Sequence, residues 1–485
     1  MSTKPARGDE AKSLAKKVFR NSVYLLAGSL ISAIIAFLLN AEIARYLRET
    51  FFGNYTLVFV HISFFIVLSH LSIDSILTRE LSKRRGQGIG LISSTFLLKT
   101  VISAVAMLLC VVIGFLMPYE NSVRLGIIFA SLTLIFTSYV MTFNAILQSR
   151  LKMAYSTIGL LASRLVFASL IFLVIRLNGG FVMLTIASLI AVISQFLLML
   201  LFSGVEVKKL FKIDKASTFL LLKESWPLAI TALMIVIYFK IDVVILKLYR
   251  GSAEVGIYSA AYMISEATTM IAVAFSTTLF PVLSSYYYKS VERFKKMYEL
   301  SFKLLFSVAL PTAVGMALIP SSIIGLVYRG SYTASAALLP VLGVAAALIS
   351  MNCLFSSVVV AINKQRENMV IPIILVIISI CANLLLIPSL GPKGAAITGL
   401  IVELLCAILT AGLIYISTKK SPLNISTLKI VFSSMVMGLL VYLLKGQLMI
   451  FLLVPLAALV YAIACILSGV FRKNELELIR SIFVR

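Results

Sequence analysis

Charged residues, and acidic ones above all, are scarce in this chain of 485 residues. Only 13% of the residues are charged and only 19 are Asp or Glu, whereas about a quarter of the residues in soluble domains are charged. The sequence also contains no Walker motif for nucleotide binding and no DxD motif for metal binding. Direct pumping driven by ATP is therefore not expected of this chain alone.

Cysteine and histidine do not form any familiar metal-binding or redox arrangement. The five cysteines lie inside apolar runs and none forms a CxxC pair, which argues against a zinc site and against a disulfide framework. The two histidines, His61 and His70, are nine residues apart, which places them on opposite faces of a helix. A shared metal site on that helix is excluded by geometry, and no cofactor is expected beyond a coupling ion.

Apolar residues, in contrast, make up 61% of the chain, and the mean hydropathy is +1.06. About 20 apolar residues suffice to cross a hydrocarbon core, and helices satisfy their own backbone hydrogen bonds there. The sequence therefore predicts an all-α polytopic membrane protein with about fourteen transmembrane helices. The expected spans are residues 21–44, 54–77, 91–117, 125–148, 156–176, 181–203, 219–246, 256–281, 300–319, 334–361, 370–388, 395–417, 429–445 and 449–470.

Lysine and arginine are distributed unequally along these spans. Of the 43, 30 lie at the N-terminus and around the loops after even-numbered spans, nine on the opposite side and four within spans. The positive-inside rule then predicts a multi-pass protein of the cell (plasma or inner) membrane with both termini in the cytoplasm. We attribute the net charge of +24 to topology and to contact with anionic lipids. Nucleic acid is not expected as a partner, because no folded domain is predicted to present a basic face.

The two halves of the chain carry similar residues at constant spacings of 203 and 212. The matched pairs are Tyr46 and Tyr249, Gly53 and Gly256, Tyr55 and Tyr258, Phe143 and Phe355, Lys152 and Lys364, and Gly179 and Gly391. They predict two pseudo-symmetric six-helix lobes in the same orientation, residues 1–205 and 206–418, followed by two additional helices and a cytoplasmic tail in 419–485. Parallel repeats place a binding site at their interface and permit rocking between inward- and outward-open states.

Several ionisable residues fall inside the predicted spans, where they usually face an aqueous cavity or a partner. Those that stand out are Lys99, Arg164, Lys240, Asp242, Glu266 and Glu403. One interpretation is a cationic chamber for an anionic group, since Lys and Arg both bind phosphate. The alternative is structural pairing between helices, or snorkelling from a span end. The candidate substrate-binding residues are Arg164, Lys99, Lys240, Arg45 and Glu266.

Three stretches of the sequence resemble the Wzx-type oligosaccharide flippases. They are Ala44-Arg45-Tyr46-Leu47 with Gly53-Asn54-Tyr55, Lys240-Ile-Asp242 with Val255-Gly-Ile-Tyr258-Ser-Ala-Ala261, and Asn383-Leu-Leu-Leu-Ile-Pro388 with Gly391-Pro-Lys-Gly394-Ala-Ala-Ile-Thr398. The resemblance covers nearly the whole chain. It departs from the family at Arg48-Glu49, where many relatives carry a Gly-Pro pair.

This resemblance implies the polysaccharide branch of the multidrug/oligosaccharidyl-lipid/polysaccharide superfamily, with two lobes around a central cavity. The implied function is not enzymatic. It is translocation of a polyprenyl-(pyro)phosphate-linked oligosaccharide from the cytoplasmic to the outer leaflet by alternating access, for assembly of cell-surface polysaccharide or glycan. A polysaccharide polymerase and glycosyltransferases are implied partners.

Some members of the family that the sequence resembles couple transport to sodium or protons, so such an ion is a candidate for coupling here. Asp242, Asn383 and Thr398 are the candidate ion-coupling residues, because their side chains offer the hard oxygen donors that sodium prefers. The alternative for Asp242 is pairing with a basic residue on a neighbouring helix.

Three other functional classes compete with this interpretation. An ion-coupled multidrug exporter of the same superfamily would favour an acidic, aromatic cavity for cationic drugs, and the basic residues inside the predicted spans argue against it. A membrane-embedded polysaccharide polymerase or glycosyltransferase would need a sizeable outer loop or a metal site, and the expected outer loops are short. A membrane scaffold without transport is the third alternative.

Overall fold

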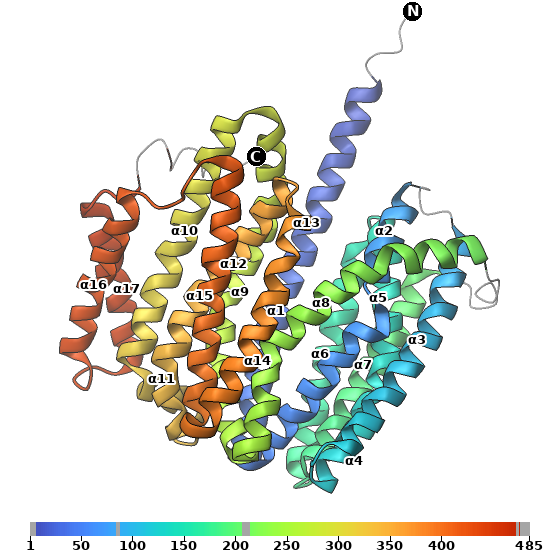
Figure 1. Cartoon of the computed structure of the whole chain (residues 1–485), viewed down its shortest axis with the longest axis horizontal. Coiled ribbons are helices and arrows are strands. Elements are labelled where there is room, and N and C mark those ends of the chain that lie inside the picture. Colours follow the sequence, from blue (N-terminus) through green and yellow to red (C-terminus); the bar gives the residue numbers. More distant parts are fainter. Residues whose placement is uncertain (1–5, 84–87, 206–213, 472–474, 476–485) are drawn as a thin grey trace, which may run out of the picture. The chain divides into compact units, whose positions relative to one another are not determined.

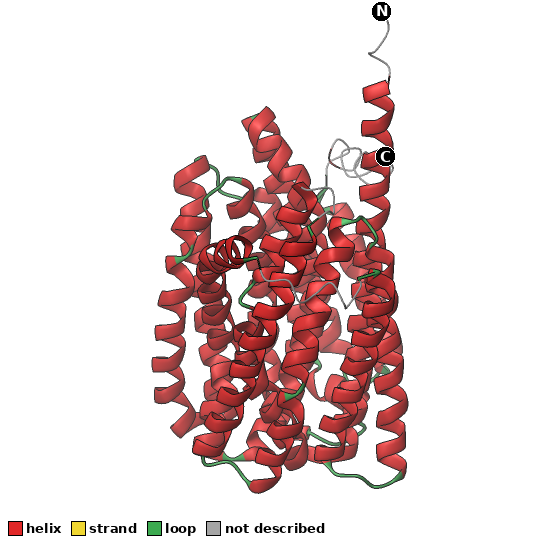
Figure 2. Cartoon of the chain, turned by 90° about the vertical axis from the view of Figure 1, so that its right-hand side faces the viewer, coloured by secondary structure: helices red, strands yellow, loops and turns green. Residues whose placement is uncertain are grey.

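The computed structural model describes residues 6–83, 88–205, 214–471 and residue 475. Within these ranges the chain consists of helices joined by short turns (Figures 1 and 2). It divides into two compact units, Met1–Leu248 and Tyr249–Arg485, which we call unit 1 and unit 2. This division follows spatial compactness, so the three-part division by sequence repeat stays a prediction.

Unit 1 contains the first eight helices, apart from the last two residues of α8. They are α1 (Ala6–His70), α2 (Ile73–Lys83), α3 (Ile89–Leu116), α4 (Asn121–Ser131), α5 (Thr133–Ser149), α6 (Met153–Arg176), α7 (Phe181–Ser203) and α8 (Lys215–Arg250). In this unit α1 packs against α3, α4 and α6, and α7 packs against α4, α5 and α6.

Unit 2 contains the remaining helices. They are α9 (Ser252–Lys289), α10 (Val291–Leu318), α11 (Pro320–Tyr328), the 3-10 helix η2 (Thr333–Leu338), α12 (Leu339–Ala361), α13 (Gln365–Asn368), α14 (Val370–Leu390), α15 (Pro392–Thr418), α16 (Ile425–Leu444) and α17 (Ile450–Leu467). α12 lies at the centre of this unit, packed against α9, α10 and α15, whereas α16 and α17 pack together beside α10 (Figure 1).

The predicted set of membrane helices is confirmed. In the described part of the chain, 13 helical segments are long and apolar enough to cross a membrane, and the chain is a multi-pass membrane protein. The first of these segments, Ala27–Lys83, holds the first two predicted spans, because a backbone break at Arg48 divides it. Each of the other twelve segments overlaps one predicted span. In unit 2, Pro320 occupies the first turn of the short helix α11, where proline is well tolerated.

Arg48 and Gly251 give the two predicted lobes the same backbone break. Arg48 has φ 58° and ψ −176°, and Gly251, which is 203 residues later, has φ 86° and ψ −180°. These values lie in a region of backbone conformation that is populated almost only by glycine. A shared unusual conformation at the spacing of the sequence repeat supports the pseudo-symmetry independently of the side chains.

A second shared feature is the turn that follows α5 in unit 1 and α12 in unit 2. Leu151 and Asn363, at the spacing of 212, both have positive φ, 53° and 57°. The next residue in each turn, Lys152 or Lys364, donates its backbone N–H to the carbonyl five residues earlier, at 2.8 and 3.0 Å. The backbone conformation thus repeats at both spacings, and the offset of 212 aligns the later parts of the two sequence repeats.

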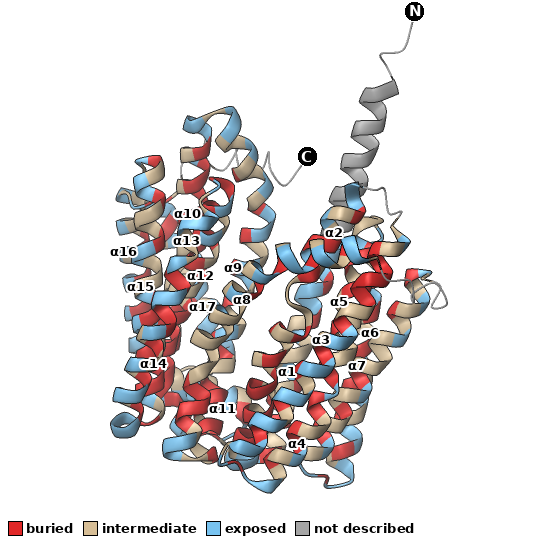
Figure 3. Ribbon diagram, turned by 45° about the vertical axis from the view of Figure 1, so that its right-hand side comes forward, coloured by how far each residue is buried: buried red, intermediate tan, exposed pale blue. Residues whose placement is uncertain are grey.

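Buried residues lie on the faces that neighbouring helices cover, and exposed apolar residues cover the outward faces (Figure 3). This arrangement suits a protein whose surrounding solvent is itself apolar. Small residues allow close helix contacts. At Gly28, for example, an added Cβ would overlap Thr157, so α1 and α6 approach closely there.

Candidate functional site

Arg164 lies on α6 of unit 1, in the middle of a membrane-spanning helix. Its side chain is partly buried, and its Nε donates a hydrogen bond to Ser32 Oγ on α1 at 3.1 Å. The buried Tyr55 is close enough to interact with it electrostatically. Among the described residues no Asp or Glu forms a salt bridge with Arg164. The guanidinium therefore keeps its positive charge uncompensated by any described carboxylate.

Lys99 on α3 is placed differently. It is fully buried (0% exposed), forms an ion pair with Asp74 on α2, and donates to the Ser138 carbonyl at 3.1 Å. This geometry favours the alternative interpretation, structural pairing between helices, over a position in a substrate chamber. Asp74 could not be paired with Lys99 from the sequence, because it is 25 residues away and at the edge of a predicted span.

The other candidate substrate-binding residues are scattered within the units. Arg45 on α1 pairs with Glu42 one turn earlier at 2.9 Å. Lys240 on α8 is partly buried, and it interacts with other described residues. Glu266 on α9 is exposed near the middle of a helix that is long enough to span the membrane. Their roles in substrate binding stay predictions.

The three candidate ion-coupling residues are buried. Asp242 on α8 belongs to unit 1, where its Oδ1 accepts a hydrogen bond from the Val243 backbone N–H at 2.8 Å. Asn383 on α14 and Thr398 on α15 belong to unit 2 and are each 1% exposed. The Oδ1 of Asn383 and the Oγ1 of Thr398 have no hydrogen-bond partner among the described residues. Such orphaned oxygens are the kind of donor that a cation could use.

Unit 2 also holds a buried carboxylate, Glu403 on α15. The Asn352 side chain on α12 donates to its Oε2 at 2.7 Å and to its backbone carbonyl at 3.1 Å. No Lys or Arg forms a salt bridge with Glu403 among the described residues. Glu403 stands out in the sequence, whereas its partner Asn352 does not, because the two are 51 residues apart.

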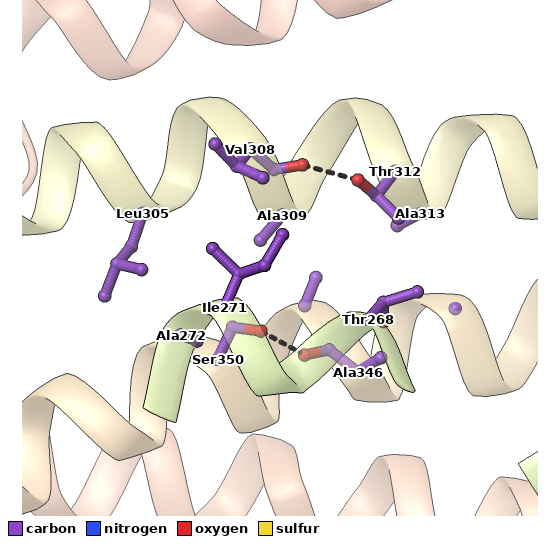
Figure 4. A pocket seen from close by; sticks show the side chains of 12 residues that line it. Thr268, Ile271, Ala272, Leu305, Val308, Ala309, Thr312, Ala313, Ala346 and Ser350 are labelled. Atoms are coloured by element: carbon purple, nitrogen blue, oxygen red, sulfur yellow. Dashed lines mark hydrogen bonds between the residues drawn. The ribbon is translucent and has the colours of Figure 1, made fainter. Parts of the chain in front are cut away.

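A small cavity of about 20 Å³ lies among α9, α10 and α12 in unit 2 (Figure 4). Its polar side chains are satisfied within their own helices: Thr312 donates to the Val308 carbonyl and Ser350 to the Ala346 carbonyl, both at 2.8 Å. The rest of its lining is mostly alanine and larger aliphatic residues. This cavity is a packing defect between apolar helices rather than a polar binding site.

Residues 18–287 of the chain match the family model described as "Polysaccharide biosynthesis protein". The chain belongs to the polysaccharide biosynthesis protein family. A second model, MatE, matches residues 227–385. The predicted membership in the polysaccharide branch of the superfamily is confirmed.

Curated relatives of this family member match a shorter stretch. A probable lipid II flippase MurJ of Bdellovibrio bacteriovorus is 28% identical over 169 residues, 33% of this chain and 32% of that protein. A probable low-salt glycan biosynthesis flippase Agl15 of Haloferax volcanii is 24% identical over 161 residues, 33% of this chain and 34% of that protein. The matches thus span about a third of the length of the curated relatives.

Among solved structures, the chain is similar to the lipid II flippase MurJ in an inward closed conformation. The TM-score is 0.78 at 16% identity, and the match covers 92% of this chain and 99% of that one. At this identity the likeness shows the fold alone. The polysaccharide biosynthesis family member therefore shares the MurJ fold over nearly its whole length.

Proposed function

We propose that this chain is a flippase that moves a polyprenyl-(pyro)phosphate-linked oligosaccharide from the cytoplasmic to the outer leaflet by alternating access. The oligosaccharide would serve assembly of a cell-surface polysaccharide or glycan. The observation that carries the proposal is Arg164, a cation in the middle of a membrane helix with no described carboxylate in a salt bridge to it. A charge in that position is costly and marks a path for a charged or polar substrate.

The chemistry of Arg164 suits a phosphate group. A guanidinium has five N–H donors in a fixed fork, and only the Nε–H of Arg164 has an acceptor among the described residues, Ser32 Oγ. The terminal nitrogens remain available for two parallel hydrogen bonds to phosphate oxygens. Ser32 is an uncharged hydrogen-bond acceptor for the guanidinium. Because it does not neutralise the positive charge, that charge can attract the phosphate of the lipid.

The named relatives support the same class of substrate. Both curated relatives are described as probable flippases, one of lipid II and one in glycan biosynthesis. A transporter needs no catalytic group, and in the described residues no cluster of three His, Cys, Asp or Glu could hold a metal ion. Glycosyltransferases that make the lipid-linked glycan and a polymerase that uses it are the proposed partners.

Coupling to a cation is part of the proposal. Asn383 Oδ1 and Thr398 Oγ1 are buried hard oxygens without a described partner, which fits a role as sodium ligands in unit 2. Asp242, which belongs to unit 1, is proposed separately as a coupling carboxylate. Transport driven by an imposed sodium gradient in liposomes should fall in Asp242→Asn. If sodium stimulation and the rate of transport are both unchanged in that variant, Asp242 is neither a coupling ligand nor an essential ion-pair partner.

The proposed orientation places both termini in the cytoplasm. In a variant without the five native cysteines, a cysteine at Ser421 should resist an impermeant thiol reagent in intact cells, and one at Asn121 should react. Both side chains are exposed. A cysteine at Ser2, which lies outside the described residues, should also resist. Labelling at Ser421 with protection at Asn121 would reverse the orientation.

A multidrug exporter is the second candidate. It is favoured by the match of residues 227–385 to the MatE model and by the exposed carboxylate of Glu266 on α9, which could attract an organic cation.

Purified full-length protein in liposomes separates the two candidates. A fluorescent lipid-linked oligosaccharide placed in one leaflet should become accessible to an impermeant lectin on the other side at a rate that depends on the protein. Export of a cationic dye, with no movement of the lipid-linked sugar, would favour the multidrug exporter and contradict the flippase.

A further inference from the structure

Unit 1 contains a cavity of about 170 Å³ among α1, α5, α6 and α7. By comparison, about 10–15 Å³ of such space holds one water molecule, so the cavity admits on the order of ten water-sized groups, which is the scale of one sugar ring with its hydroxyls. It lies beside the turn between α5 and α6, near the start of α6. In the proposed orientation this is the cytoplasmic end of unit 1.

The walls of this cavity are unusually polar for a membrane-spanning bundle. Five hydroxyl or amide side chains that line it make no hydrogen bond to any described residue: Ser29, Asn144, Gln148, Ser156 and Gln195. Ser29 and Gln148 are exposed, Asn144 and Gln195 are partly buried, and Ser156 and the Oδ1 of Asn144 are buried. Inside a bilayer buried polar groups normally find partners on neighbouring helices. The buried or partly buried members, Asn144, Ser156 and Gln195, indicate that the space receives a polar occupant.

At two of the five positions the second repeat shows that the fold does not require a polar side chain. At the spacing of 212 that aligns the later parts of the two repeats, Gln148 corresponds to Val360 and Gln195 to Ala407, whereas Asn144 and Ser156 correspond to the polar residues Ser356 and Asn368. In the small cavity of unit 2 the threonine and serine hydroxyls bond to carbonyls of their own helices, as Figure 4 shows for Thr312 and Ser350. The amides of Gln148 and Gln195 are therefore additions to a fold that is built without them.

Arg164 and its partner Ser32 lie about one helical turn beyond the residues that line the cavity. On α6, Leu160 lines the cavity and Arg164 is four residues further, on the same face and about 6 Å along the axis. On α1, Ser29 lines the cavity, and Ser32, which holds Arg164, is three residues further. On α6 and α1, the turn that lines the cavity is thus followed by the turn that holds Arg164 or its partner Ser32. Arg164 is the deeper of the two features in the membrane.

We propose that this cavity is a subsite for a neutral sugar of the lipid-linked glycan, seated beside a phosphate held by Arg164. This inference rests on the proposed flippase function and adds to it a location and a specificity for the carbohydrate. The recognised chemistry is a ring bearing hydroxyl or acetamido groups. The sugar nearest the phosphate fits best, because the cavity and Arg164 are only about one helical turn apart.

Three features of the lining set this specificity. The amides of Asn144, Gln148 and Gln195 each offer donors and an acceptor, which suits neighbouring sugar hydroxyls. Aliphatic side chains complete the wall and can cover the C–H face of a ring; these are Leu25, Met153 and Leu160. No Asp, Glu, Lys or Arg is among the described residues that line the cavity, so an acidic sugar would find no counter-charge from these residues.

Binding to the full-length protein in detergent tests the inference. The probes are a polyprenyl pyrophosphate alone and the same lipid carrying one neutral N-acetylhexosamine. We expect the wild type to bind the glycosylated lipid about tenfold more tightly, because two or more neutral hydrogen bonds are gained. The double variant Asn144→Leu/Gln195→Leu should bind both lipids equally. Arg164→Gln should weaken binding of both.

Matched controls separate the sugar contact from a folding defect. Ser169 is an exposed serine on α6, the helix that carries Arg164, and its hydroxyl bonds only to the Leu165 carbonyl. The variant Ser169→Leu should bind both lipids as the wild type does. The double variant replaces unpartnered polar groups by apolar ones, which is usually neutral or stabilising, so its thermal stability should not fall. Gln148→Leu, at the end of α5, gives a second variant with the same expected loss of selectivity.

Each other outcome has a distinct meaning. Equal binding of both lipids by the wild type, with no change in the double variant, overturns the sugar subsite and leaves the proposed flippase intact. Failure of the wild type to bind either lipid overturns the proposed function, and the subsite with it. Tight binding of a lipid that carries a hexuronic acid overturns the neutral specificity. Displacement of the glycosylated lipid by phosphatidylglycerol vesicles at equal concentration would assign the cavity to a membrane-lipid headgroup instead.

Discussion

The two repeats share their backbone breaks and turns but differ in the polar side chains that they bury. Leu151 and Asn363 occupy the same left-handed turn, yet 13 residues later Arg164 in the first repeat is matched by Val376 in the second. The reverse holds for the buried acid, since Glu403 is matched by Ala191. The first repeat therefore places a partly buried cation where the second is apolar, and the second buries an acid where the first is apolar.

This difference distinguishes the residues that the fold requires, which both repeats share, from the polar residues that only one repeat contains. Positions that set the backbone, such as the breaks at Arg48 and Gly251, are shared. Buried polar positions that occur in only one repeat can be replaced by apolar residues without loss of the architecture, because the other repeat is built that way. Such positions are either structural pairs particular to one lobe or parts of a functional site, and their partners distinguish the two cases.

Removal of Lys99 should have the largest effect on stability. Lys99→Met removes the cation that pairs with the Asp74 carboxylate, at a position where the Lys99 side chain is fully buried. Breaking a buried ion pair lowers the free energy of unfolding by about 3–5 kcal/mol. The free energy of unfolding in detergent, measured by denaturant titration, checks this value. The double variant Lys99→Met/Asp74→Leu should recover most of the loss. A single variant as stable as the wild type would show that Lys99 is not a structural pair and would return it to the substrate chamber.

Removal of the Asn352 amide should have an intermediate effect. Asn352→Leu takes away the described donors to the Glu403 side chain and costs about 1–3 kcal/mol, the penalty for an unsatisfied buried acceptor. Val140→Leu, at the equivalent position of the first repeat, is the matched control and should cost less. If Asn352→Leu is harmless while Glu403→Gln is costly, Glu403 has a partner other than Asn352 and the contrast between the repeats needs another explanation.

Relief of the backbone strain at Arg48 should have the smallest effect on stability, and it should increase stability rather than decrease it. Arg48 is exposed and holds a conformation that glycine adopts readily, so Arg48→Gly should raise stability by about 1 kcal/mol. Gly251→Ala is the matched change in the other repeat and should lower stability by a similar amount. Equal and negligible effects at both positions would mean that the shared break is not strained.

The sequence predicted the helices well because each apolar run had to satisfy the same requirement of length and composition. The repeat was also visible, since Gly53 and Gly256 and the tyrosines around them keep a constant spacing. The partners of the buried charges were not visible. Helix packing brings each of these charged residues into contact with a partner far away in the sequence. The pairs are Lys99 with Asp74, Arg164 with Ser32, and Glu403 with Asn352.

The cavity of unit 1 was not visible for the same reason. Serine, asparagine and glutamine are common in membrane helices as single residues, and each alone gives no signal. Only packing of α1, α5, α6 and α7 brings five of them around one space. A search for polar positions that are apolar in the other repeat could have selected Gln148 and Gln195 before the structure was known.

The proposed flippase function depends most on Arg164, whose positive charge should bind the substrate rather than stabilise the fold. Its direct test is the rate of lipid-linked oligosaccharide movement in liposomes, measured together with the free energy of unfolding, for wild type, Arg164→Gln and Arg164→Lys. We predict that Arg164→Gln lowers the rate at least about tenfold while stability changes by no more than about 1 kcal/mol, since one hydrogen bond to Ser32 is lost. Arg164→Lys should restore part of the rate. A normal rate in Arg164→Gln, or a loss of rate that follows a loss of stability, would contradict the account.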